Sequence, residues 1–190
     1  MQVNRDLLFS LDKETLYVNS NNPITEGIFN VMKAFKKIYF FESFNQPVDN
    51  LPSNIEEISF ERDFNQPVDN LPMGLKKIKF GQYFNQPLDN LPIGLEVLEF
   101  VGHSEFNQPL DNLPINLKKL FLGFSYNLPL FCLPEGLKSM NIPYRYKHSM
   151  TKFPLGLNEV ILPIKAPPKP FGKHWIEIRD RYSNYSHYDC

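Results

Sequence analysis

The chain has 190 residues with 20 basic and 21 acidic side chains, and its formal net charge of −1 gives it no bulk electrostatic reason to bind nucleic acid or an anionic membrane. Its two cysteines, Cys132 and Cys190, cannot form a disulfide framework, which favours a reducing compartment. No apolar run reaches bilayer-spanning length and the opening residues lack the features of a signal peptide, so we expect a cytoplasmic location.

Residues 1–34 precede the regular part of the chain and are predicted to form an N-terminal cap. Apolar residues at 7–11 and 15–18, separated by Asp-Lys-Glu, are typical of a short β-hairpin. Between residues 24 and 35 the apolar positions follow a helical period, with Asn22 as a cap and Pro23 in the first turn. A stack of repeats must cover the open end of its core, and this segment is expected to do so.

The next part of the chain is an internal repeat. The letters Phe-Asn-Gln-Pro begin at Phe44, Phe64, Phe84 and Phe106, with steps of 20, 20 and 22 residues. Two degenerate copies begin at Tyr126 and Tyr146. A fixed period in this range is typical of stacked supersecondary units, each of which contacts mainly its neighbours.

Every repeat also carries a segment of the form Leu-x-x-Leu-x-Phe, whose last four residues alternate with the period of a β-strand. These segments are 35–40, 55–60, 75–80, 95–100, 117–122, 137–142 and 157–162. Because each one returns in the same direction, neighbouring strands must pair in parallel. Two prolines per repeat, such as Pro87 and Pro92, exclude a regular helix on the return side. Residues 35–162 are therefore predicted to form a β-rich solenoid of seven rungs, with about 20 residues per rung.

The turn before each strand has a position that holds only Gly or Asn. Its occupants are Asn54, Gly74, Gly94, Asn116, Gly136 and Gly156. Gly and Asn are the residues that most readily adopt a positive φ, so we expect a left-handed backbone at this position. On this argument Gly94→Val should damage folding, whereas Gly94→Asn should be mild.

Two columns of recurring residues are predicted to be structural. The rings of Phe44, Phe64, Phe84 and Phe106 should be buried, and the amides of Asn45, Asn65, Asn85 and Asn107 should satisfy backbone groups of the neighbouring turn. The recurring aspartates at 49, 69, 89 and 111 are expected to bond local backbone amides as turn residues. Recurrence on every rung favours this interpretation, because a catalytic group normally occurs once.

The pattern weakens after residue 140 and ends near residue 162. Residues 163–190 are predicted to form a C-terminal cap or tail. Within them, residues 175–178 could form one more short strand, and Trp175 is expected to seal the end of the core. Residues 182–190 are interpreted either as an ordered edge or as a frayed tail.

The repeated Phe-Asn-Gln-Pro-(Val/Leu)-Asp-Asn-Leu-Pro-x-(Gly/Asn)-Leu-x-x-Leu-x-Phe resembles the FNIP repeat, a short relative of the leucine-rich repeat. The resemblance is close over residues 44–122 and looser over 35–162. It implies a leucine-rich-repeat-like, right-handed superhelix with a parallel sheet along one face. Such proteins are abundant in social amoebae and in giant DNA viruses that infect amoebae, so a viral member would act in the host cytoplasm. In that family the repeats are often joined to an F-box, which implies delivery of a bound target to a ubiquitin ligase.

The outward-facing strand positions are the predicted partner-binding face. Their candidate residues are Tyr39, Lys77, Lys79, Glu99, Lys119, Phe121, Asn141 and Ile161. Charges on this face alternate in sign from rung to rung, so sheet stabilisation by opposite charges is a competing explanation. Phe121 interrupts the charged face, either as an anchor for a partner or as a residue packed under the C-terminal segment. The two-residue insertion around His103 is a further candidate contact.

Features of an enzyme are not apparent in the sequence. His148, His174 and His187 lack metal-like mutual spacing, His103 fits an exposed loop, and no nucleophile-elbow, phosphate-loop or paired-cysteine motif occurs. We therefore expect no catalytic residue, metal or cofactor. The predicted function is a non-enzymatic protein–protein interaction module that binds through the outward sheet face or the bulged edge. The alternative is a target-recognition component of a ubiquitin ligase that acts with an F-box protein. The sequence leaves the oligomeric state open.

Overall fold

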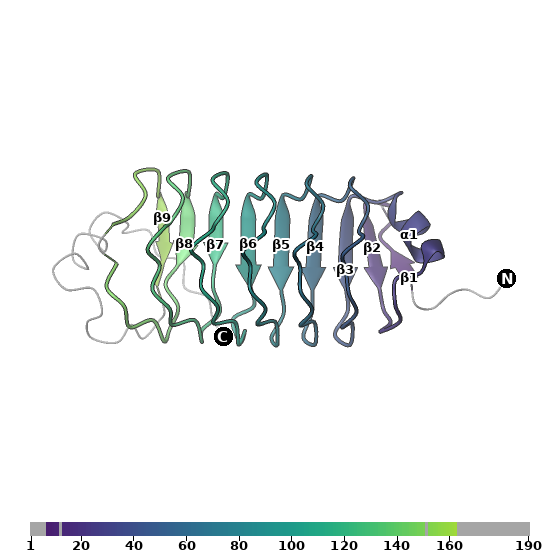
Figure 1. The fold of residues 1–190 in the computed structure, drawn as a ribbon, viewed down its shortest axis with the longest axis horizontal. Helices are drawn as coiled ribbons and strands as arrows, with labels where there is room; N and C mark the ends of the chain where they lie inside the picture. Colours follow the sequence, from purple (N-terminus) through teal and green to yellow (C-terminus); the bar gives the residue numbers. More distant parts are fainter. Residues whose placement is uncertain (1–6, 12, 151, 163–190) are drawn as a thin grey trace.

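One β-sheet runs from β1 to β9, the full extent of the described residues (Figure 1). The computed structural model describes residues 7–11, 13–150 and 152–162. In these residues the elements are β1 (Leu7–Phe9), β2 (Thr15–Val18), α1 (Glu26–Met32), β3 (Lys37–Phe40), β4 (Glu57–Phe60), β5 (Lys77–Phe80), β6 (Val97–Phe100), β7 (Lys119–Phe121), β8 (Ser139–Asn141) and β9 (Glu159–Ile161). Their order in the sheet is their order in the sequence. The predicted cap at 163–190, with its strand at Trp175, lies outside the described residues.

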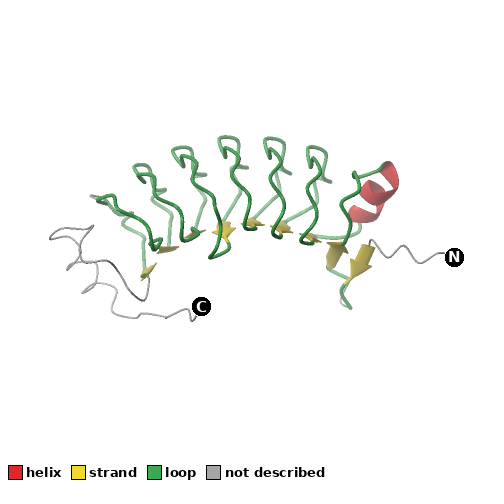
Figure 2. Ribbon diagram, turned by 90° about the horizontal axis from the view of Figure 1, so that it is seen from below, coloured by secondary structure: helices red, strands yellow, loops and turns green. Residues whose placement is uncertain are grey.

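The predicted parallel solenoid is confirmed by the pairing of the strands. Strands β2 to β9 pair in parallel, and equivalent repeat positions face each other, as Ile38, Ile58 and Ile78 do on β3, β4 and β5. Figure 2 shows that the stack is curved, with the strands along the inner side of the arc and the turns along the outer side. The sheet therefore lines the concave face. Among the described residues, no helix is long and apolar enough to cross a membrane.

The N-terminal segment forms the predicted hairpin and helix, but it joins the sheet more closely than the sequence indicated. Strands β1 and β2 are antiparallel, and β2 then pairs in parallel with β3, so the hairpin adds two strands to the sheet and one of them, β2, to its parallel part. The predicted cap at Asn22 is wrong. Helix α1 begins later, and its N-cap is Thr25, whose hydroxyl accepts a hydrogen bond from the Ile28 N–H at 3.4 Å.

Two columns of stacked aromatic rings fill the interior. One column comes from the last residue of a strand, such as Phe80, and the other from the first residue of the repeat letters, such as Phe84. Both rings are fully buried, and their centroids lie 3.7 Å apart. Along the second column, Phe84 stacks on Phe64 at 6.0 Å and on Phe106 at 6.1 Å. Each ring thus packs within its own rung and against both neighbouring rungs, which is why a single rung could not bury its core alone.

The second column ends in two buried tyrosines that replace phenylalanine. The hydroxyl of Tyr146 accepts a hydrogen bond from the Leu130 N–H at 3.2 Å. The hydroxyl of Tyr126 is buried and has no hydrogen-bond partner among the residues that the structure describes. Burial raises the pKa of both phenols. The two sites differ mainly in whether the buried hydroxyl is paired.

We expect Tyr126→Phe to raise the free energy of unfolding by about 1 kcal/mol, because it removes a buried hydroxyl that forms no hydrogen bond. Tyr146→Phe should lower the free energy of unfolding by about 1 kcal/mol, because the Leu130 N–H loses its acceptor. Urea denaturation of the two variants measures both effects. A larger loss at Tyr126 than at Tyr146 would show that the Tyr126 hydroxyl is paired in solution.

The recurring asparagines form a hydrogen-bond ladder between rungs, which we call the asparagine ladder. The Oδ1 of one asparagine accepts from the backbone N–H of its counterpart in the next rung, as between Asn65 and Asn85 at 2.9 Å. The same bond joins Asn21 to Asn45, Asn45 to Asn65, Asn85 to Asn107, Asn107 to Asn127 and Asn127 to Lys147, at 2.8–2.9 Å. The glutamine that follows adds a second donor, and Gln86 Nε2 lies 3.2 Å from Asn65 Oδ1. One side-chain oxygen thus satisfies donors on the next rung.

The aspartates play a different part from the one predicted. Their hydrogen bonds in the structure come from the asparagine of the next rung rather than from local backbone amides. The distances from Asn Nδ2 to Asp Oδ1 are 3.3 Å for Asn70 to Asp49, 3.0 Å for Asn90 to Asp69 and 3.4 Å for Asn112 to Asp89. Because the rungs stack in register, the neighbouring turn presents an amide to Asp49, Asp69 and Asp89, whereas the turn after Asp111 has Cys132 in place of the asparagine. Stacking therefore replaces the local turn bond.

The prediction of a positive φ at the Gly/Asn position is wrong. None of the described glycines has a left-handed φ, and the only described non-glycine residue that does is Lys13. The position instead faces two backbone carbonyls of the preceding rung. Asn54 Nδ2 donates to Lys33 O at 3.1 Å and to Phe35 O at 2.7 Å. Glycine fits at the same place because its absent side chain leaves room beside those carbonyls, and asparagine fits because it donates to them.

This correction changes the expected effect of substitutions at Gly94. An added Cβ would lie 3.6 Å from Met73 O and 3.9 Å from Leu75 O, which is ordinary contact. We expect Gly94→Asn to raise the free energy of unfolding by about 1 kcal/mol, because its amide can donate to these carbonyls. The reverse change, Asn116→Gly, removes a 3.0 Å bond to Ile93 O and should lower the free energy of unfolding by a similar amount. Chemical denaturation of the two variants tests this, and a marked loss from Gly94→Asn would refute the carbonyl explanation.

Candidate functional site

The concave face is built from the residues that alternate with the buried core along each strand. In β3, Ile38 and Phe40 are buried while Lys37 and Tyr39 are partly exposed, and β4, β5 and β6 repeat this pattern. Parallel pairing in register brings equivalent side chains of successive strands side by side. The face is therefore a continuous surface across the rungs rather than a set of separate sites.

Opposite charges on neighbouring rungs are paired in much of this surface. Glu56 lies between two lysines, with its oxygens 2.9 Å from Lys36 Nζ and 3.3 Å from Lys76 Nζ. Hydrogen bonds to Lys36 and Lys76 hold the pKa of Glu56 below its usual value. Lys37 contacts Glu57 at 3.4 Å and Glu14 at 3.5 Å. These pairs fit the explanation that alternating charges stabilise the sheet, although each exposed pair contributes little.

Two lysines on this face, Lys79 and Lys119, have no ion pair within the described residues. Glu99 is the register partner of Lys79, but its carboxylate binds Lys77 on the diagonal at 3.0 Å. Lys119 lies opposite Val97, which offers no charge. Lys79 therefore lies next to the Glu99 carboxylate without forming an ion pair with it.

These two lysines lie in a mixed surface that we call the β5–β7 patch. It consists of Lys79, Val97, Lys119 and Phe121, on three successive strands. The Phe121 ring is partly exposed. The patch combines two unpaired cations with an aliphatic and an aromatic side chain, which suits a partner surface with apolar and acidic groups.

Two of the predicted binding residues, Asn141 and Ile161, have structural roles that leave them little free surface for a partner. The side chain of Asn141 bridges the neighbouring strand, accepting from Leu122 N at 2.6 Å and donating to Leu122 O at 2.7 Å. Ile161 was expected to be an exposed apolar position, but it is only 9% exposed. Ser139, on the same end of the face, is buried and donates to Glu159 at 2.6 Å. The open part of the face therefore ends near β7 in the described structure.

An aromatic cluster occupies the other end of the face. Tyr17 on β2, Tyr39 on β3 and Phe41 just after β3 lie with ring centroids 5.3–6.0 Å apart. The Tyr39 hydroxyl donates a hydrogen bond to Glu61 Oε1. Burial, together with this carboxylate, raises the pKa of Tyr39 to about 12. Only Tyr39 was among the predicted residues, because Tyr17 joins it only through the pairing of β2 with β3.

The predicted contact at the insertion forms an exposed corner. His103 is exposed, and its ring meets the edge of Phe124 at 5.7 Å. Beneath it, Ser104 is fully buried and accepts a hydrogen bond from the Phe106 N–H at 3.2 Å. The strands before and after the insertion, β6 and β7, remain in register. The insertion exposes His103 next to the Phe124 ring.

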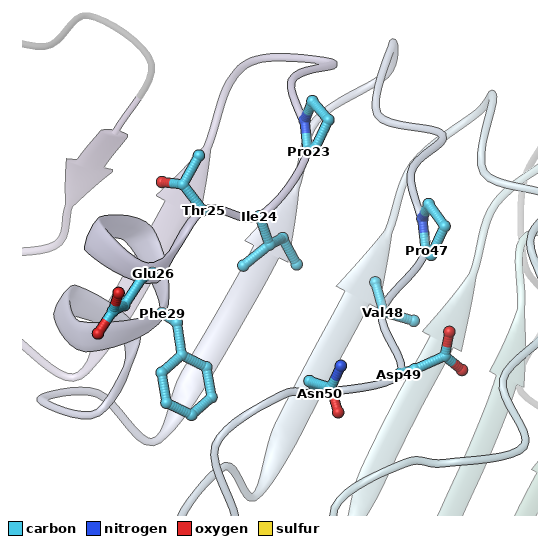
Figure 3. A pocket seen from close by; sticks show the side chains of 9 residues that line it. All are labelled: Pro23, Ile24, Thr25, Glu26, Phe29, Pro47, Val48, Asp49 and Asn50. Atoms are coloured by element: carbon cyan, nitrogen blue, oxygen red, sulfur yellow. The ribbon is translucent and has the colours of Figure 1, made fainter.

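A shallow groove of about 440 Å³ lies between α1 and the first full turn (Figure 3). Its walls are Pro23, Ile24, Thr25, Glu26 and Phe29 on one side and Pro47, Val48, Asp49 and Asn50 on the other. Later turns pack against another turn of the repeat, whereas here the preceding segment contains α1 (Figure 2). The groove lies where the helix α1 meets the first turn of the repeat, and the sequence analysis did not predict it.

An exposed apolar stripe also escaped prediction. Met73, Ile93 and Ile115 hold the same position on three successive rungs and are 71%, 61% and 69% exposed. Their signal in the sequence is the apolar residue between Pro and Gly/Asn, where the flanking rungs have Ser53 and Glu135. Among the described residues, no three His, Cys, Asp or Glu side chains form a group that could hold a metal ion.

Comparison with known proteins places the chain among repeat proteins. Residues 64–103 match the family model of the FNIP repeat. No curated protein sequence matches the chain. The fold is similar to the crystal structure of CroV588, described as a novel circular leucine-rich-repeat protein, with a TM-score of 0.50 and 24% sequence identity. The match covers 87% of this chain and 34% of that one, so the chain spans about a third of its length.

Proposed function

We propose that this chain, whose residues 64–103 match the FNIP repeat and whose fold is leucine-rich-repeat-like, is a non-enzymatic module that binds another protein on its concave face. The observation that carries this proposal is the β5–β7 patch. Most of the surrounding charges are paired with each other, whereas Lys79 and Lys119 have no ion pair within the described residues. The patch is therefore a part of the face whose cations remain free to bind a partner.

The partner that fits this patch presents an apolar side chain flanked by carboxylates. Val97 and Phe121 offer the apolar contact, and an aromatic ring on a rigid strand loses little conformational freedom on binding. The two lysines would steer an acidic partner and select against a basic one. The bulged corner at His103 lies on the connection between β6 and β7 and is proposed as a secondary contact.

Site-specific photocrosslinking in the native cell tests the proposal. We expect p-benzoylphenylalanine in place of Phe121 to give a discrete adduct with one partner protein. The matched control has the same group in place of Phe131, which is 77% exposed on the return side of its rung, and it should give no such adduct. The double charge reversal Lys79→Glu and Lys119→Glu should abolish the adduct at position 121. Equal adducts at positions 121 and 131, or none at 121, would contradict the proposal.

A narrower form of the proposal rests on the FNIP resemblance alone. In it, the bound protein is delivered to a ubiquitin ligase of the cell, and this chain acts with an F-box protein in the cytoplasm. Mass spectrometry of the adducts from the same experiment distinguishes the two forms. An F-box protein crosslinked to this chain supports the narrower form, and its absence from all adducts leaves a binding module without a ligase role.

A further inference from the structure

The aromatic cluster of Tyr17, Tyr39 and Phe41 differs from the aromatic rings of the core. Rings along the core column stack almost flat, as Phe64 and Phe84 do with an interplanar angle of 2°, and they are fully buried. The rings of the cluster are tilted by 39–69° to one another and stay partly exposed. The cluster therefore presents π-electron surface and ring edges to whatever lies on the concave face.

The electrostatic surroundings of the cluster are acidic. The Glu61 carboxylate accepts from the Tyr39 hydroxyl through Oε1 and has no ion pair within the described residues. Of the nearby cations, Lys37 is shared between two glutamates, and Arg62 lies 3.0 Å from Asp63 and 4.0 Å from a further carboxylate. Lys79 on β5 faces Ser59 of β4, and Glu61 accepts no ion pair from it. A ring surface next to an unpaired carboxylate attracts cations through two independent terms, the ring quadrupole and the full negative charge.

We propose that the aromatic cluster and Glu61 bind an arginine side chain of the partner protein, an inference that rests on the proposed concave-face function. A guanidinium group is planar, stacks on aromatic rings and donates in pairs to a carboxylate, so it can use both features at once. A lysine ammonium lacks the planar stacking and the paired donors, so arginine is favoured over lysine.

The two ends of the face then recognise opposite charges at a defined separation. From Tyr39 on β3 to Phe121 on β7 there are four steps between neighbouring strands, or about 19 Å. An extended partner segment that crosses the strands spans this distance with about six residues. The expected partner segment therefore carries an arginine about six residues away from an apolar residue flanked by acidic groups.

Nuclear magnetic resonance titration of the full chain with N-acetylarginine amide tests the arginine site. The control compound is N-acetylcitrulline amide, which has nearly the same shape without the charge. We expect the arginine compound to shift the ring resonances of Tyr17, Tyr39 and Phe41 and to bind about tenfold more tightly than the citrulline compound. Equal binding of the two compounds would overturn the proposal.

Matched variants locate the binding groups. Glu61→Gln keeps an oxygen that can accept from Tyr39 but removes the charge, so affinity for the arginine compound should fall about five- to tenfold. Tyr39→Phe keeps the ring and releases the Glu61 oxygen, so it should bind at least as tightly as the natural chain. Lys119→Met changes β7, four strand steps from Tyr39, and should leave the affinity unchanged. An unchanged affinity in Glu61→Gln, with the variant folded, would also overturn the proposal.

The two proposals fail separately. A specific adduct at position 121 with no preference for arginine over citrulline would remove the arginine site and leave the concave-face function. Arginine binding that depends on Glu61, without an adduct at position 121, would retain the site and remove the β5–β7 patch as the place where the partner is held.

Discussion

Replacing Phe84 with alanine is expected to lower the free energy of unfolding by about 3–5 kcal/mol. The ring is fully buried and stacks on Phe80, Phe64 and Phe106. Its removal leaves a cavity that is bounded by three rungs, and the stacked backbone cannot collapse into it without loss of the asparagine ladder. Urea denaturation followed by circular dichroism measures the loss.

Phe131→Ala is the matched control for this experiment. Phe131 is 77% exposed, so the same change of residue should alter the free energy of unfolding by less than about 0.5 kcal/mol. If Phe84→Ala had an effect as small as that of Phe131→Ala, the Phe84 ring would not be part of the core in solution.

The second large effect is expected at Gly81, in the corner that follows β5. A Cβ added there would lie 2.0 Å from Glu61 O and 2.3 Å from Glu61 C, both in the backbone of the preceding rung. Gly81→Ala must therefore push two rungs apart, and we expect it to lower the free energy of unfolding by about 3 kcal/mol. The argument concerns close approach alone, because Gly81 does not have a left-handed φ.

Glycine-to-alanine substitution at Gly27 should change the free energy of unfolding in the opposite direction. Gly27 lies in α1, and an added Cβ would meet only the Thr25 hydroxyl oxygen at 3.8 Å. Alanine has the better helix propensity, so Gly27→Ala should raise the free energy of unfolding by about 0.5–1 kcal/mol. Thermal unfolding of both variants gives the comparison. Similar effects at the two positions would show that crowding by the Glu61 backbone is not what requires glycine at Gly81.

The repeat could be recognised from the sequence, and its strands and their parallel register followed from it, because stacking imposes one spacing on every rung. The roles of individual polar residues were harder to predict than the repeat itself. Gly and Asn can alternate before each strand for two reasons, a left-handed backbone or nearby backbone carbonyls. The hydrogen bonds from Asn54 to Lys33 O and Phe35 O show that the second reason applies. The aspartates were misassigned for a similar reason, since their partners lie about one repeat away in the sequence.

The candidate site was only partly accessible to prediction. The outward positions of β3 to β7 could be listed from the period of two, but which charges remain unpaired depends on side-chain reach. Glu99 could bind Lys79 across the strands or Lys77 on the diagonal, and it binds Lys77. The aromatic cluster required knowledge that β2 pairs with β3, because Tyr17 and Tyr39 belong to segments without a common motif.

The asparagine ladder gives the stack a direction. In every bond the acceptor oxygen belongs to the earlier rung and the donor N–H to the later one, from Asn21 through Asn127 to Lys147. Synthesis from the N-terminus makes each acceptor before its donor, so a rung that folds during translation has the acceptor oxygen of the preceding rung available to it. Lys147 has no side-chain oxygen to offer a further rung, so templating by this ladder stops at the rung where the repeat motif is lost.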